Sequence, residues 1–186
     1  DRGLDNQHLA HRFVGSAIWE LPFGRRRHWG SGWGVLPDLL AGQWSVASIV
    51  TLRAGLPLTA TVLGNPANTN SESRPDVTRN PVLSSRERTL GRWFDTEAFV
   101  PNRPFTYGNA GRNILISPGA ANVDFALYKR FAVTERFETQ FRFEAFNFFN
   151  TPAFGSPGSV LLSSNYGTIT SAGRPRNLQF GVKVMF

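Results

Sequence analysis

The sequence predicts an all-β chain, an antiparallel segment of a transmembrane β-barrel with about five long strands and long external loops. Five stretches alternate between apolar and polar residues with a period of two. Each stretch has 10–13 residues. A tilted strand needs about 9–11 residues to cross a bilayer, whereas strands of soluble proteins most often have about 5–6. One aromatic-rich stretch also carries three charges on its other face, which suits a strand between lipid and water.

The first two strands are expected at 11–21 and 43–54, with an alternative end of the second strand at residue 63, reached through Gly55 and Pro57. The apolar faces contain Phe13, Ala17, Trp19 and Leu21 in the first, and Trp44, Val46, Val50 and Leu52 in the second. The third strand is expected at 122–132, where Lys129 and Phe131 fall on the apolar side and blur the alternation.

The last two strands are expected at 136–148 and 177–186. Both show uninterrupted alternation, which is a strong strand signal. A weaker, short strand is expected at 166–171. Several aromatic residues lie near strand ends, where the interfacial girdle of a barrel would place them.

The connectors predict an orientation. Residues 133–135 form a very short turn, whereas 64–121 and 150–173 are long and rich in polar residues, and 22–42 is intermediate. Because outer-membrane barrels have short periplasmic turns and long external loops, the C-terminus is expected on the periplasmic side. Barrels of one chain start at about 8 strands, so residues 1–186 are expected to be the C-terminal part of a larger barrel.

A series of short motifs carries a family resemblance from about residue 11 to the end. They are His11-Arg12-Phe13-Val14, Glu20-Leu21-Pro22-Phe23-Gly24, Gly42-Gln43-Trp44, Ala54-Gly55-Leu56-Pro57, Trp93-Phe94-Asp95, Ala98-Phe99, Gly108-Asn109-Ala110-Gly111-Arg112-Asn113, Arg142-Phe143-Glu144-Ala145-Phe146-Asn147-Phe148-Phe149-Asn150 and the terminal stretch from Gln179 to Phe186. In this order the chain resembles the C-terminal barrel region of TonB-dependent outer-membrane receptors of the Oar-like branch, whose N-terminus carries a carboxypeptidase-regulatory-like domain.

The resemblance implies an outer-membrane barrel of about 22 strands, closed by a plug that precedes this region. It implies uptake of a siderophore, a glycan or a peptide, with energy delivered by a periplasmic coupling protein that acts on the missing N-terminal part. The expected partners are outer-membrane lipid, the plug and remaining strands, and the barrel-assembly machinery. The alternatives are a passive porin or adhesion barrel, and a secreted carbohydrate-binding β-sandwich.

Three sets of residues are candidate functional sites. The candidates for the lumen wall are Arg12, Arg53, Glu138, Gln140, Arg142 and Glu144, whose charges would otherwise pair across strands. The candidates for ligand contact on the external loop are Trp93, Phe94, Phe99, Tyr107 and Arg112, which would otherwise pack the loop into a compact lid. The C-terminal assembly signal is expected to comprise Leu178, Phe180, Val182, Val184 and Phe186.

The sequence gives no sign of an enzyme, a metal or a cofactor. It has no Cys and only three His, and it contains neither a nucleophile-elbow motif nor a phosphate-binding loop. Its net charge of +7 and the run Arg25-Arg26-Arg27 resemble a nucleic-acid footprint, but the expected periplasmic position excludes that partner. The run is expected to be a solvated turn or a clamp on acidic lipid headgroups.

Overall fold

The computed structural model describes residues 2–25, 27–69, 71–132 and 137–186. The predicted turn at 133–135, the first residue of the strand expected at 136–148, and Arg26 lie outside the described residues. Among the described residues, no helix is long and apolar enough to span a bilayer.

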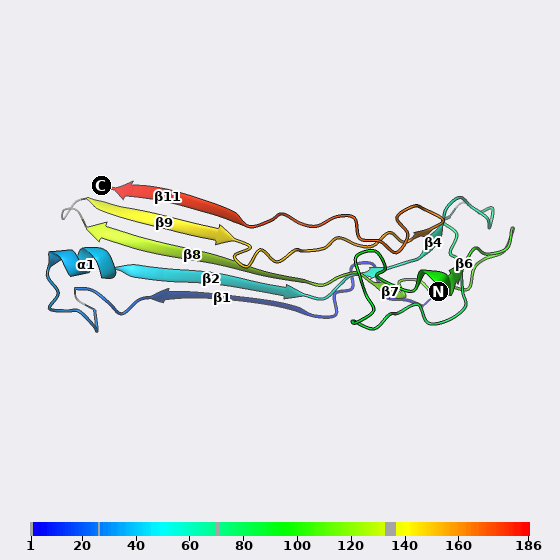
Figure 1. The fold of residues 1–186 in the computed structure, drawn as a ribbon, viewed down its shortest axis with the longest axis horizontal. Coiled ribbons are helices and arrows are strands. Elements are labelled where there is room, and N and C mark those ends of the chain that lie inside the picture. The colour runs from blue at the N-terminus through cyan, green and yellow to red at the C-terminus, as the bar shows by residue number, and fades with distance from the viewer. Residues whose placement is uncertain (1, 26, 70, 133–136) are drawn as a thin grey trace. The chain divides into compact units, whose positions relative to one another are not determined.

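Five long strands form one antiparallel sheet, seen side by side in Figure 1. In chain order they are β1 (Arg12–Glu20), β2 (Trp44–Arg53), β8 (Ala120–Ala132), β9 (Glu138–Phe146) and β11 (Asn177–Met185). Their order in the sheet is β1-β2-β8-β9-β11, so each strand lies beside its neighbours in the chain. The five predicted long strands are therefore present, with each boundary within two residues of its expected place. Within the described residues the sheet is open at β1 and β11 rather than closed into a barrel.

The strand register places apolar residues opposite one another. Phe143 of β9 pairs with Leu127 of β8 on one side and with Phe180 of β11 on the other. Because side chains alternate between the two sides of a sheet, these three residues share one face. Apolar side chains of this face in β11 are exposed, Phe180 by 66% and Val182 by 69%, which shows that the described part of the chain does not cover them.

Strand β9 ends two residues earlier than the alternation predicts. Asn147 adopts a left-handed conformation with φ of 53°, which an extended strand does not allow. Its backbone N–H donates to Asp124 Oδ1 at 2.9 Å, so the chain leaves the sheet at a fixed point.

A short helix occupies the connector between β1 and β2, where the sequence predicted no regular element. Helix α1 (Val35–Ala41) lies between Gly34 and Gly42 and has no buried residue. The indole N–H of Trp44, the first residue of β2, donates to the Leu40 carbonyl at 2.9 Å.

The chain forms two compact units. The sheet unit comprises Phe13–Leu52, Ala121–Thr151 and Arg174–Phe186, and the loop unit comprises Asp1–Arg12, Arg53–Ala120 and Pro152–Gly173. In the loop unit β3 (Pro57–Leu58) pairs with β7 (Leu115–Ile116), β4 (Thr61–Val62) with β10 (Val160–Leu161), and β5 (Asp76–Val77) with β6 (Phe99–Val100), which follows the 3-10 helix η1 (Thr96–Ala98). Its core is the cluster of Ala60, Val62, Phe94, Ala98, Phe99, Ala110, Leu115 and Leu161.

The two long connections thus fold against each other. Their structure shows that two strand predictions are wrong. The second long strand does not continue to residue 63, because β3 and β4 belong to separate small sheets. Gly55 approaches the backbone too closely for a side chain, since a Cβ there would lie 1.7 Å from the Ser117 carbonyl oxygen. The expected strand at 166–171 is wrong: this segment makes an isolated bridge between Gly158 and Tyr166, and β10 lies earlier in the chain.

Candidate functional site

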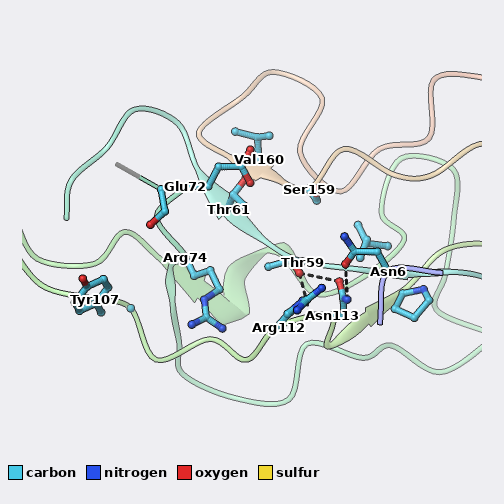
Figure 2. A pocket seen from close by; sticks show the side chains of 14 residues that line it. Asn6, Thr59, Thr61, Glu72, Arg74, Tyr107, Arg112, Asn113, Ser159 and Val160 are labelled. Atoms are coloured by element: carbon cyan, nitrogen blue, oxygen red, sulfur yellow. Dashed lines mark hydrogen bonds between the residues drawn. The ribbon is translucent and has the colours of Figure 1, made fainter. Parts of the chain in front are cut away.

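A polar pocket of about 770 Å³ opens in the loop unit. Figure 2 shows that its side chains come from the N-terminal segment, from the long connection after β2 and from the connection before β11. The lining residues are Asn6, Pro57, Leu58, Thr59, Thr61, Ser71, Glu72, Arg74, Tyr107, Gly108, Arg112, Asn113, Ser159 and Val160.

Asn113 fixes one side of this pocket. Its side chain is buried at 3% exposure and its φ is 57°, a left-handed conformation that asparagine tolerates better than most residues. Its amide nitrogen Nδ2 donates to Asn6 Oδ1 at 2.7 Å and to the Leu4 carbonyl at 2.6 Å. Its Oδ1 accepts a hydrogen bond from the Thr59 hydroxyl at 2.8 Å (Figure 2). Asn113 therefore ties three distant segments together, and its own polar groups are already used.

The rim of the pocket is available to a ligand. Tyr107 is 78% exposed, and Glu72 and Arg112 are exposed as well. An exposed aromatic ring offers a stacking surface, and the carboxylate and guanidinium offer strong hydrogen-bonding groups. This chemistry suits a polar ligand rich in hydroxyl or amide groups.

The structure separates the five predicted loop candidates. Tyr107 and Arg112 line the pocket. Phe94 and Phe99 are buried at 2% and 4% exposure and lie edge to face with a ring separation of 6.0 Å. The indole N–H of Trp93 donates to the Ile116 carbonyl at 2.8 Å. The burial and contacts of Phe94, Phe99 and Trp93 favour the compact-lid alternative for these three side chains.

Sequence reasoning missed the other polar lining residues. Asn6, Thr59, Thr61 and Ser159 are ordinary loop residues with no local motif. Thr61 and Ser159 meet because β4 pairs with β10, which joins segments about a hundred positions apart, whereas Asn6 and Thr59 are brought in by hydrogen bonds with Asn113. No signal in the sequence alone marks such a non-local pairing.

Asp95, a buried carboxylate of the loop unit that lies outside the pocket, binds two arginines. Its carboxylate accepts hydrogen bonds from Arg79 Nε at 2.7 Å and from Arg92 Nη2 at 2.9 Å. Only 10% of this side chain is exposed. The hydrogen bond from Arg79, aided by Arg92, lowers the pKa of the Asp95 carboxyl below its usual 3.8, although burial opposes the shift.

We expect this pair of bonds to make the loop unit acid-sensitive. A depressed pKa in the folded state adds stability above the unfolded pKa, and this stability is lost as the pH falls through the folded pKa. Pulse proteolysis with pepsin between about pH 5 and pH 2 should therefore show a steeper loss of protection in the native protein than in Asp95→Asn. Glu97→Gln is the control, because Glu97 is 79% exposed and its bond to Arg79, at 3.3 Å, is longer than the bond between Arg79 and Asp95. Equal slopes in native protein and Asp95→Asn would contradict the prediction.

The four predicted lumen residues of β9 lie on one face and contact polar neighbours. Glu138 lies 3.7 Å from Arg130, and Arg142 Nε donates to Gln140 Oε1 at 2.8 Å. The Tyr128 hydroxyl donates to Glu144 at 3.5 Å. One of these contacts is an ion pair and the other two join a charge to a neutral polar group, so each charge of β9 has a polar neighbour on this face. Arg12 and Arg53, the other two candidates, are exposed residues at the ends of β1 and β2.

The predicted C-terminal signal lies on the opposite, apolar face of β11. Val184, Val182, Phe180 and Leu178 pair in turn with Thr139, Phe141, Phe143 and Ala145 of β9. Exposure along this row runs from 49% at Leu178 to 96% at the terminal Phe186.

A comparison with protein families shows to which family this sheet, with one polar and one apolar face, belongs. A family model described as an outer membrane beta barrel domain matches residues 1–179. The chain belongs to this family. No curated protein and no solved structure matches it. Membership of the outer membrane barrel family places the chain in the bacterial outer membrane, where the apolar face of a barrel strand is the face that meets lipid. The family assignment argues against the secreted β-sandwich.

Proposed function

We propose that this chain is the C-terminal wall of an energised outer-membrane receptor, which binds a polar substrate such as a glycan or a peptide in its loop unit. The observation that carries the proposal is the pocket of about 770 Å³ in a unit with its own core. A passive pore needs a water-filled lumen but no folded unit with a binding pocket. In an energised receptor such a unit captures substrate before transport.

The connectivity supports the orientation with the C-terminus on the periplasmic side. The segments that build the loop unit, Arg53–Ala120 and Pro152–Gly173, connect β2 to β8 and β9 to β11. In an antiparallel sheet both connections leave from the same end, opposite the C-terminal end of β11. Outer-membrane barrels carry their large loops on the external side.

The proposed receptor needs further strands. A barrel edge within lipid would leave backbone N–H and C=O groups unsatisfied, at a cost of several kcal/mol each. The open edges of β1 and β11 therefore require additional barrel strands. A barrel of about 22 strands has a wide lumen, which a plug must close. We propose that an N-terminal region supplies both, that a periplasmic coupling protein acts on it, and that the barrel-assembly machinery binds β11.

Conductance distinguishes an energised receptor from a passive porin. The full-length protein is reconstituted in a planar phospholipid bilayer and the current is recorded at fixed voltage. The proposal predicts no channel current from the untreated protein, because the plug fills the lumen. It predicts channel currents after the plug is unfolded with urea. Steady open channels in the untreated protein would contradict the proposal and favour the porin.

Tyr107→Ala is expected to weaken ligand binding without unfolding the loop unit. Loss of one stacking ring costs about 1–1.5 kcal/mol, which corresponds to roughly a tenfold weaker affinity. The probes are panels of neutral oligosaccharides and of short peptides, titrated against the full-length protein by calorimetry. Phe105→Ala is the matched control, because Phe105 is also 78% exposed but does not line the pocket. Equal affinities of both variants for a probe that the native protein binds would exclude Tyr107 from the site.

A further inference from the structure

One charged residue lies on the apolar face of the sheet. Lys129 of β8 pairs directly with Phe141 of β9, so it shares a face with the phenylalanines of the apolar band. Lys129 is nevertheless only 2% exposed. A charge on the lipid side of a barrel is costly unless other groups satisfy it.

Helix α1 satisfies this charge. The Lys129 ammonium donates to the carbonyl of Asp38 at 3.2 Å and to the carbonyl of Gly42. The Asp38 carbonyl, which also accepts the Gly42 backbone N–H, lies in the last turn of α1, and Gly42 follows the helix as its C-cap. The ammonium is therefore at the C-terminal end of α1, where the helix dipole favours a cation. The ammonium also lies 5.4 Å from the Trp44 ring. Lys129 and Trp44 thus hold the C-terminal end of α1 at the apolar side of the sheet. This end of α1 lies beside the start of β2 and the end of β8 (Figure 1).

The outward surface of α1 is apolar and uncovered. Val35, Leu36, Leu39 and Leu40 are exposed by 66%, 70%, 46% and 74%. No residue of α1 is buried, so packing within the described chain does not account for these four side chains. Val35, Leu36, Leu39 and Leu40 recur at helical spacing, so they form one apolar face of α1.

The turn before α1 has the chemistry of a membrane interface. Trp29 is 54% exposed, and Arg25 is exposed and donates from Nε to the Trp33 carbonyl at 3.0 Å. The backbone N–H of Arg25 donates to Asp38 Oδ1 at 2.6 Å, which fixes the turn to the helix. Tryptophan and arginine beside exposed aliphatic residues are typical of segments at the boundary between headgroups and acyl chains.

We propose that α1 and its preceding turn are a lipid anchor, inserted into the phospholipid leaflet at the periplasmic end of the barrel wall. The occupant follows from the attachment of α1 to the apolar face of the sheet through Lys129, and from the positive charge of the exposed Arg25, which complements headgroup phosphates. This inference rests on the proposed orientation, which puts the β1–β2 connector on the periplasmic side. In water the same surface would be an unexplained apolar patch.

Fluorescence quenching tests the anchor in the full-length protein. Single cysteines at Leu36→Cys and Leu40→Cys are labelled with bimane, and the protein is reconstituted in phosphatidylcholine and phosphatidylglycerol vesicles. Brominated acyl chains quench a label in lipid, and iodide quenches a label in water. Val182→Cys is the lipid-facing control, and Ser85→Cys, an exposed residue of the loop unit, is the water-facing control.

The anchor predicts that both α1 labels lose fluorescence in brominated lipid, as Val182→Cys does, and resist iodide. Iodide quenching of both α1 labels, with Val182→Cys still quenched by brominated lipid, would overturn the anchor and leave the receptor proposal intact. Iodide quenching of Val182→Cys as well would place the β11 face in water, and the receptor proposal would fail together with the anchor.

Discussion

Phe94→Ala is expected to destabilise the loop unit by about 3–5 kcal/mol, the usual cost of removing a buried aromatic side chain. Phe94 is 2% exposed and lies 5.2 Å from the ring of Tyr166 and 6.0 Å from that of Phe99. Truncation therefore removes the centre of an aromatic cluster. Hydrogen–deuterium exchange of the full-length protein in lipid should show faster exchange throughout 54–119 and 152–173, with the five long strands unchanged.

Two control variants are compared with Phe94→Ala. Phe105→Ala makes the same substitution at a side chain that is 78% exposed, and it should change exchange little. Tyr166→Phe keeps the ring but removes a buried hydroxyl with no hydrogen-bond partner among the described residues, so it should be neutral or stabilising. Unchanged exchange in Phe94→Ala would mean that the loop unit has no cooperative core.

Val182→Arg is expected to destabilise the barrel by about 2–4 kcal/mol, because it places a charge on the lipid face near the middle of β11. Gln179→Arg, on the opposite face of the same strand, should cost much less, since Gln179 pairs with Glu144 and an arginine there gains a carboxylate neighbour. Urea titrations of the full-length protein in vesicles, followed by the heat-dependent shift in electrophoretic mobility, give the two free energies of unfolding. Equal losses in both variants would contradict a two-faced strand.

The sheet is the part of the fold that sequence reasoning predicts well. Its signal is local, because alternation within one strand, such as Leu178, Phe180 and Val182, assigns each residue to a face without knowledge of the neighbours. The strand ends are less predictable. Asn147 ends β9 through a left-handed conformation and a hydrogen bond to Asp124, and neither is visible in the alternation.

The loop unit and the helix could not be predicted for a different reason. The pocket depends on pairs such as Thr59 with Asn113, 54 residues apart, and the core joins Leu161 to residues of the other long connection. Helix α1 has only seven residues and contains Pro37, so its helical pattern is weak. The buried position of Lys129 makes sense only with α1 beside it, whereas from sequence it merely interrupts the alternation.

A spin-label scan of β11 tests whether the sheet separates lipid from a polar interior. Each residue of Asn177–Met185 is replaced in turn by a labelled cysteine in the full-length protein, reconstituted in phospholipid vesicles. The collision rate with oxygen, which concentrates in lipid, is compared with that of a water-soluble nickel chelate. A strand between lipid and a polar interior predicts a period of two, with oxygen dominant at Leu178, Phe180, Val182 and Val184 and low at Gln179, Gly181 and Lys183. Uniform access of the nickel chelate, or alternation with the opposite phase, would contradict it.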